Sequence, residues 1–98
     1  MKPVYLSIRK EETGKRIGEM IEERGLTVKD IQEGLGFESS QAIYKWISGK
    51  SLPSLDNILI LSKLLHTSIE DILVLDGDTF LLNHKDSPSE EKLPQLPY

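Results

Sequence analysis

The stretch that decides the fold is SSQAIYKWISGKSLP at 39–53, which follows VKDIQEGLGF at 28–37. Apolar side chains recur at helical spacing in both stretches, so each one predicts a short helix. Gly36 supplies a tight turn between the two helices, and Gly49 ends the second one. The pair therefore predicts two short helices joined by a glycine-containing turn, of which the second presents a polar face.

The two faces of this second helix differ in chemistry. At roughly 100° per residue, Ile43, Trp46 and Ile47 fall on one side, which we assign to the core. The opposite side is polar, and its members are Gln41, Tyr44, Lys45 and Ser48. Their amide, phenol, ammonium and hydroxyl groups suit contacts with base edges and phosphates in a DNA major groove. A polar face on a short helix is more often simply solvated, so this pattern alone favours solvation.

Three further helices are predicted around this pair. Each of the five begins at a residue whose side chain can cap the first turn. The predicted caps are Thr13, Thr27, Ser39, Ser54 and Ser68. Thr27 with Asp30, and Ser68 with Asp71, also have the spacing of a capping box. The helix after Ser54 is apolar around much of its circumference, so we expect it to be the central buried element.

The helical pattern spans residues 13–75, and five short helices with short links predict a compact all-α domain there. Residues 1–12 form a predicted N-terminal arm. Within this arm, PVYLSI at 3–8 is β-prone and suits a short strand. RKEE at 9–12 is predicted to be a charged connector between the strand and the first helix.

A C-terminal extension at 76–98 follows the helices. It opens with a predicted turn at 76–78, and TFLL at 79–82 is a candidate for a second short strand. The last part, 85–98, is polar and rich in Pro, so it cannot bury enough apolar surface to order itself. We expect it to be disordered, and the two strands to pair with each other or across a dimer.

Composition excludes several classes of protein. The 98 residues make one domain, and the absence of Cys excludes disulfides and Cys-based zinc sites. No apolar run approaches the ~18 residues that span a membrane, and the N-terminus has no cleavage signal, so we expect a cytoplasmic protein. The net charge of −4 argues mildly against indiscriminate binding of nucleic acids, but a local basic face remains compatible with specific binding.

The sequence offers little for catalysis, cofactors or metal binding. His66 and His84 lie far apart, and His66 suits the end of a helix better than a metal site. Gly34 and Gly36 begin a phosphate-loop-like string that lacks both its third Gly and its preceding strand. Glu pairs are more often solvated charge than catalytic acids. We therefore expect neither an enzyme nor a cofactor or metal site.

Residues 13–74 resemble the Cro/repressor-type helix-turn-helix family, which is also called the XRE family. The resemblance runs through IGEMIEERGLTVKDIQEGLGF, SSQAIYKWISGKSLPS and LDNILILSKLLHTSIEDIL. It implies a lambda-repressor-like five-helix domain. In that family the first helix of the pair crosses the DNA backbone and the next enters the major groove. Double-stranded DNA is therefore the implied partner.

The resemblance also implies which residues face DNA. Those expected to face bases or nearby phosphates are Ser40, Gln41, Tyr44 and Lys45. Those expected to approach a phosphate at the start of the earlier helix are Thr27, Val28 and Lys29. Lys50 and Ser51 are implied to contact the backbone on the other side. Ser39 and Ser40 also lie at a helix N-terminus, where backbone amides can hold a phosphate.

Three departures from the family pattern concern the same region. Val28 stands where the family often has Gln, and Gln32 stands where it favours Ala. The turn after Gly36 is one residue longer, because Glu38 and Ser39 fill it. We expect the longer turn to rotate the next helix slightly, and Glu38 to add negative charge near the DNA face.

The resulting hypothesis is a sequence-specific transcriptional regulator, a repressor that binds a pseudo-palindromic operator as a homodimer. The fifth helix, PVYLSI and TFLL are the candidate dimer surfaces. The alternative is a protein-interaction module, such as the antitoxin of a toxin–antitoxin pair. The acidic balance favours it, as does a C-terminal tail that would fold onto a protein partner. A small enzyme or ligand sensor is the least supported reading.

Overall fold

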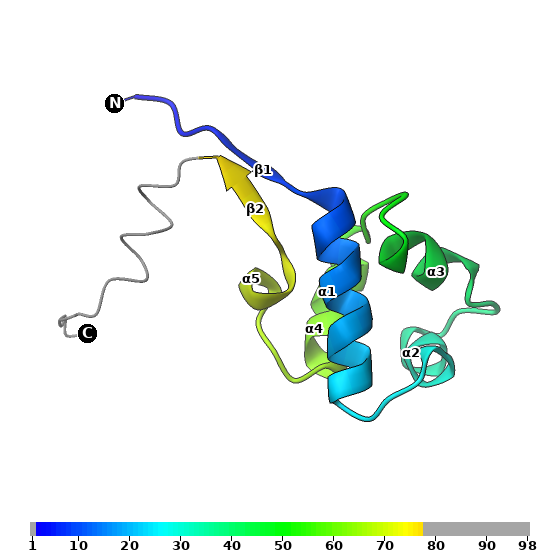
Figure 1. Ribbon diagram of the computed structural model, residues 1–98. Coiled ribbons are helices and arrows are strands. Elements are labelled where there is room, and N and C mark those ends of the chain that lie inside the picture. The colour runs from blue at the N-terminus through cyan, green and yellow to red at the C-terminus, as the bar shows by residue number, and fades with distance from the viewer. Residues whose placement is uncertain (1, 78–98) are drawn as a thin grey trace, which may run out of the picture. The chain divides into compact units, whose positions relative to one another are not determined.

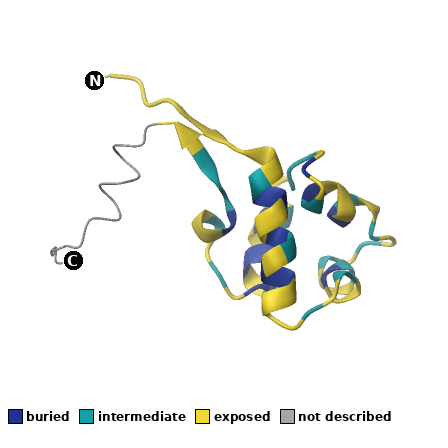
Figure 2. Cartoon of the chain, in the orientation of Figure 1, coloured by how far each residue is buried: buried dark blue, intermediate teal, exposed yellow. Residues whose placement is uncertain are grey.

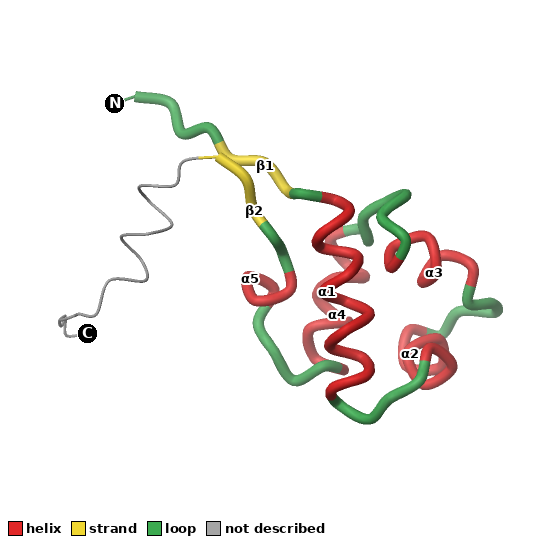
Figure 3. Tube along the Cα trace, in the orientation of Figure 1, coloured by secondary structure: helices red, strands yellow, loops and turns green. Residues whose placement is uncertain are grey.

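The computed structural model describes residues 2–77 of the chain. Its elements are β1 (Leu6–Ile8), α1 (Lys10–Glu23), α2 (Val28–Leu35), α3 (Gln41–Ile47), α4 (Leu55–Leu64), α5 (Ile69–Ile72) and β2 (Leu75–Gly77), as Figures 1 and 3 show. All five predicted helices are present, and a short strand lies within the predicted 3–8 segment. The strand predicted at 79–82 and the tail at 85–98 lie outside the described residues.

The core lies where the five helices meet. α1 packs against α3 and α5, while α4 packs against α2 and α5. The buried apolar side chains come from all five helices, as the dark blue segments of Figure 2 show. They are Ile17, Met20, Ile21, Ile31, Ile43, Trp46, Ile58, Leu61, Leu65 and Ile72. The assignment of Ile43 and Trp46 to the core is therefore confirmed.

The prediction that α4 is the central buried element was wrong. Leu55 is 80% exposed and Leu59 is 49% exposed, although both belong to its apolar pattern. The side of α4 that carries Ile58 and Leu61 is buried, because α2 and α5 cover that side. An apolar composition allows a helix to be buried on many sides. How many of those sides are buried depends on how many neighbouring helices pack against it.

α1 begins at Lys10, three residues before its predicted cap at Thr13. Most of the segment at 9–12, predicted to be a charged connector, therefore belongs to the first turn of the helix. Arg9 is the N-cap, and the carboxylates of Glu11 and Glu12 lie in the first turn, where the positive end of the helix dipole stabilises negative charge. Thr13 is fully buried, and its Oγ1 accepts a hydrogen bond from the Val74 N–H at 2.9 Å. Thr13 therefore caps no helix. It instead ties α1 to the segment after α5.

The predicted cap of α3 was also displaced. The helix begins at Gln41 with Ser40 as its N-cap, and the Ser40 side chain makes no capping hydrogen bond. Ser39 Oγ accepts a long hydrogen bond of 3.5 Å from the Gln41 N–H. The reason is the longer link between α2 and α3, which occupies residues 36–40.

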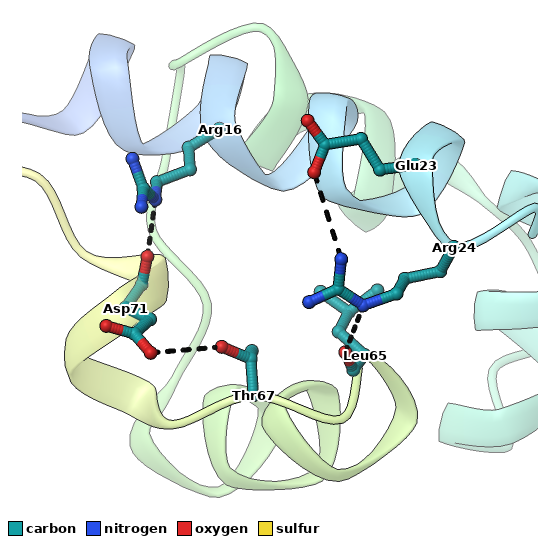
Figure 4. Close-up of polar contacts among 6 residues, drawn as sticks. All are labelled: Arg16, Glu23, Arg24, Leu65, Thr67 and Asp71. Carbon is teal, nitrogen blue, oxygen red and sulfur yellow. Dashed lines mark hydrogen bonds and ion pairs between the residues drawn. The ribbon is translucent and has the colours of Figure 1, made fainter.

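The other capping predictions held to different degrees. The capping box of Thr27 and Asp30 is complete, with hydrogen bonds of 2.8 and 3.1 Å. Ser54 accepts from the Asn57 N–H at 3.2 Å, as expected for a cap of α4. Ser68 accepts from the Asp71 N–H at 3.1 Å, while the Asp71 carboxylate accepts from the Thr67 hydroxyl at 3.5 Å (Figure 4).

β1 and β2 form a two-stranded sheet within one chain. β2, at Leu75–Gly77, includes two residues of the predicted turn at 76–78, so that part of the turn prediction was wrong, while the pairing expected for 79–82 lies outside the described residues. An Asp-Gly pair is typical of a turn, but here its backbone is paired with that of β1.

Candidate nucleic-acid interface

The α2–α3 pair is joined by the link that the glycine pattern predicted. Gly36 ends α2 in the left-handed conformation, with φ of 75°. Phe37 then turns back to the core, where its ring meets the Trp46 ring edge-on at a centroid distance of 6.0 Å. Because Trp46 is only 4% exposed, its ring anchors α3 from below and leaves the opposite face free.

Close backbone contact with α1 fixes the far end of α3. A Cβ at Gly14 would lie 2.0 Å from the Trp46 carbonyl oxygen and 2.9 Å from that of Ile47. Only glycine leaves room for these carbonyls, so the last turn of α3 rests directly on the α1 backbone. Gly14 and Phe37 therefore both hold the last turn of α3, one through the Trp46 carbonyl and the other through the Trp46 ring.

The polar side of α3 is open to solvent, as the wheel predicted. Gln41, Tyr44 and Lys45 are all exposed, with Tyr44 at 56%. This side borders an open depression of about 510 Å³. Its lining residues are Ser40, Gln41, Tyr44, Lys45, Ile47, Ser48 and Lys50. We call this surface the α3 face, and five of the ten predicted DNA-contact residues line it.

The remaining five predicted residues lie around the α3 face. Thr27 and Lys29 are exposed at the start of α2, whereas Val28 is half-buried and packs against the core. Ser39 lines a second depression of about 320 Å³, together with Phe37 and Glu38 of the link. Ser51 is half-buried, and its N–H donates to the Lys45 carbonyl at 3.4 Å.

Sequence reasoning assigned Ile47 only to the core. The structure shows this side chain half-buried, packed on the core and bordering the α3 face. Ser48, which the wheel placed on the polar side, also lines it, and its hydroxyl donates to the Lys45 carbonyl at 3.2 Å. The signal for Ile47 was its place at the edge of the apolar stripe, where a side chain can belong to both surfaces.

The electrostatics of this region differ from those of the whole chain. The net charge is −4, yet no Asp or Glu occurs between Ser39 and Leu55. Lys45 and Lys50 lie in this stretch, and within the described residues neither ammonium group makes an ion pair or hydrogen bond. The α3 face therefore offers free positive charge in an acidic protein, which suits phosphate contact.

Other basic residues serve the fold. Arg24 Nε donates to the Leu65 carbonyl at 2.7 Å, and Arg16 Nε donates to the Asp71 carbonyl (Figure 4). These carbonyls lie at the C-terminal ends of α4 and α5, where cations are favourable. Arg24 also pairs with Glu23 at 3.8 Å. The two arginines thus link α1 to the C-terminal ends of α4 and α5.

The described part of the chain contains no cluster of three or more His, Asp or Glu side chains that could hold a metal ion. His66 follows Leu65, the C-cap of α4, as predicted for a residue at a helix end, and its φ is 54°. Between residues 2 and 77, no helix is both long and apolar enough to cross a membrane.

Several solved structures share this fold. The P22 c2 repressor protein in complex with synthetic operator 9T matches with a TM-score of 0.58 and 28% identity, over 62% of this chain and 91% of that one. The restriction-modification controller protein C.AhdI from Aeromonas hydrophila matches with a TM-score of 0.58 and 22% identity, over 63% and 92%. The clp gene regulator ClgR from C. glutamicum matches with a TM-score of 0.59 and 15% identity, over 87% and 99%.

No curated protein matches the chain. The family model for helix-turn-helix proteins, HTH_3, matches residues 17–72, which is more than half of the chain. This span runs from the middle of α1 to the end of α5 and contains the α2–α3 pair and most of the core. The chain belongs to the Cro/repressor-type (XRE) helix-turn-helix family of DNA-binding transcriptional regulators.

Proposed function

We propose that this protein is a transcriptional repressor that binds a pseudo-palindromic operator in double-stranded DNA as a homodimer, with α3 in the major groove. The observation that carries the proposal is the α3 face. It is exposed, rigidly supported from below and free of carboxylates, and it carries unpaired lysines. These are the properties of a helix that reads base edges.

The residues of the α3 face have distinct proposed roles. Gln41 has the amide geometry to bond adenine through two hydrogen bonds, and Lys45 can donate to guanine or to a phosphate. Tyr44 lies between them in sequence and offers a hydroxyl and a ring face. Lys50 follows α3 and is proposed to contact the DNA backbone. Together they would combine base reading with phosphate contact in one continuous surface.

A second set of proposed phosphate contacts lies at the start of α2. Lys29 and Thr27 are exposed there, beside backbone N–H groups that point out of the helix N-terminus. Val28 packs against the core, so its proposed contribution is the backbone amide rather than its side chain. Ser39, Ser40 and Ser51 are proposed to contact phosphates near α3.

We infer a homodimer because one copy of α3 reads only half of a symmetric site. Two groups of exposed apolar side chains are available for the contact. One lies in and beside β1, at Val4, Tyr5, Leu6 and Ile8, and the other lies on α4, at Leu55, Leu59 and Ile60. α5 offers less exposed apolar surface for a dimer contact, because Ile72 is buried and the apolar residues near it pack on the core.

Light scattering would assign the dimer surface. If β1 forms it, Tyr5→Ser with Leu6→Ser should yield a monomer, while Leu55→Ser with Leu59→Ser should leave the dimer intact. The reverse pattern would assign the contact to α4. A monomer for the unsubstituted chain, with and without DNA, would overturn the dimer.

Selection of sequences from a random duplex pool tests DNA recognition directly. We expect the protein to enrich one motif with two-fold symmetry, and its affinity for that motif to fall steeply with salt, because bound phosphates release counterions. An unenriched pool, or an affinity independent of salt, would overturn the proposal.

A protein-interaction role is the second candidate, because the net charge is −4 and the segment at 85–98 carries few apolar residues. A regulator that only reads DNA should keep its operator affinity after deletion of 85–98. Weaker DNA binding after this deletion would mean that the segment contributes to DNA binding and is more than a passive tail.

A further inference from the structure

Gln32 holds the link between α2 and α3 at a single residue, Phe37. The Phe37 N–H donates to the Gln32 carbonyl at 3.0 Å, and the Gln32 side-chain amide donates to the Phe37 carbonyl at 3.3 Å. Both backbone polar groups of Phe37 are therefore held by Gln32. The second hydrogen bond needs an amide-length side chain, which Ala could not provide.

Phe37 is also held from the side of α3. Its ring packs edge-on against Trp46 at 6.0 Å, with the ring planes at 65° to each other. Since Trp46 belongs to α3, a continuous path of contacts runs from the Gln32 amide through Phe37 to the helix that carries the α3 face. The carbonyl that Gln32 holds belongs to the peptide that leads directly into Glu38.

The link after Phe37 has little other support. Glu38 is exposed, and its side chain makes no ion pair or hydrogen bond within the described residues. Ser39 contributes only the 3.5 Å contact with the Gln41 N–H, and the Ser40 side chain makes no capping hydrogen bond. The direction in which the chain enters α3 thus depends strongly on the peptide after Phe37.

We propose that Gln32 is a positioning residue for sequence-specific DNA recognition, an inference that rests on the proposed function. Its side-chain amide fixes the plane of the peptide between Phe37 and Glu38, and thereby the rotation of the α3 face toward the bases. Base reading requires side chains to be held within a fraction of an ångström, whereas phosphate contact by flexible lysines tolerates rotation. Loss of the amide should therefore reduce specificity and spare general affinity for DNA.

The test uses the full chain and the motif that it selects from a random duplex pool. Gln32→Met keeps the length of the side chain and removes the donor, while Gln32→Glu presents a carboxylate to the Phe37 carbonyl. Glu33→Asp is the matched control, because Glu33 is exposed on the same helix and keeps its charge. Affinity is measured for the selected motif and for an unrelated duplex at one salt concentration.

We expect both Gln32 variants to lower affinity for the selected motif about tenfold, the loss of one well-placed base contact. For Gln32→Met, which keeps the charge of the chain, affinity for the unrelated duplex should stay within twofold. Glu33→Asp should alter neither affinity. Equal losses on both duplexes, or unchanged affinity for the motif, would overturn the positioning role.

Two further measurements separate this inference from folding and from the proposed function. Emission from Trp46, the only Trp in the chain, reports whether each variant is folded. Gln32→Lys keeps an N–H donor of similar reach, so it should retain the ratio of the affinity for the motif to the affinity for the unrelated duplex. A reduced ratio in this variant would overturn the role of the donor. This test remains available even if Gln32→Met unfolds. A wild-type chain that enriches no motif would overturn the proposed function, and this inference with it. Enrichment with an unchanged ratio would overturn this inference alone.

Discussion

Two sets of basic residues in the molecule differ in their contacts. Around α3, Lys45 and Lys50 extend from a stretch without carboxylates and have no partner among the described residues. Around α4 and α5, Arg16 and Arg24 donate to the carbonyls at helix ends (Figure 4). The difference teaches that basic residues on one molecule can have separate roles: the arginines stabilise helix ends, whereas the two lysines leave their charge available on the proposed DNA face.

The largest effect should come from removing the support beneath the α3 face. Trp46→Ala should lower the free energy of unfolding by about 3–5 kcal/mol, because a buried aromatic ring is lost and a cavity remains. Thermal melting followed by circular dichroism measures this loss. Tyr44→Ala on the exposed side is the matched control and should change stability by less than about 0.5 kcal/mol. Similar losses for both variants would erase the distinction between the two sides of α3.

The next largest effect should be on DNA binding alone. Gln41→Ala combined with Lys45→Ala should lower affinity for the selected motif about 100-fold, because each base contact contributes about 1–3 kcal/mol of discrimination. Gel retardation measures the affinity, and the melting temperature should remain nearly unchanged. Loss of folding in this variant would mean that the α3 face is structural.

The arginine region should show the opposite behaviour. Arg24→Ala should lower the free energy of unfolding by about 1.5 kcal/mol, near the low end for a charged hydrogen bond because the side chain is 34% exposed. Its effect on the salt dependence of DNA binding should be negligible. Denaturation by urea measures the first quantity and binding titrations the second. A shallower salt dependence would place Arg24 on the DNA.

The smallest effect should come from a single phosphate contact. Lys50→Ala should weaken binding to all duplexes about equally and reduce the slope of log affinity against log salt by about 0.9. Stability should not change, because the ammonium group has no partner within residues 2–77. Loss of sequence preference in this variant would instead assign Lys50 to base reading.

Local features were predicted well from the sequence. The Thr27–Asp30 capping box, the Gly36 turn and the burial of Ile43 and Trp46 all appeared as expected. Each depends on residues at most four positions apart, so spacing along the chain is enough to identify it. The exposure of Gln41, Tyr44 and Lys45 was predicted for the same reason, because the periodicity of one helix separates its faces.

Predictions failed where distant segments meet. Thr13 looks like a cap in sequence, yet its hydroxyl oxygen accepts a hydrogen bond from the N–H of Val74, 61 residues away. The turn expected at 76–78 is partly a strand because β1 pairs with it. Gln32 appeared only as a departure from a family pattern, and its hydrogen bond to Phe37 became visible only when the link had a definite path.

The sequence by itself determined the family, the five helices and the division of α3 into a buried and an open side. These follow from helical period, glycine positions and caps, which are local properties of the chain. Tertiary structure alone decided that α4 keeps an open apolar side, that two arginines serve helix ends, and that Gln32 reaches Phe37. The physical reason is that burial and hydrogen bonding between elements depend on which surfaces the fold brings together. The apolar period of one helix identifies its buried side but does not identify the elements that pack against it.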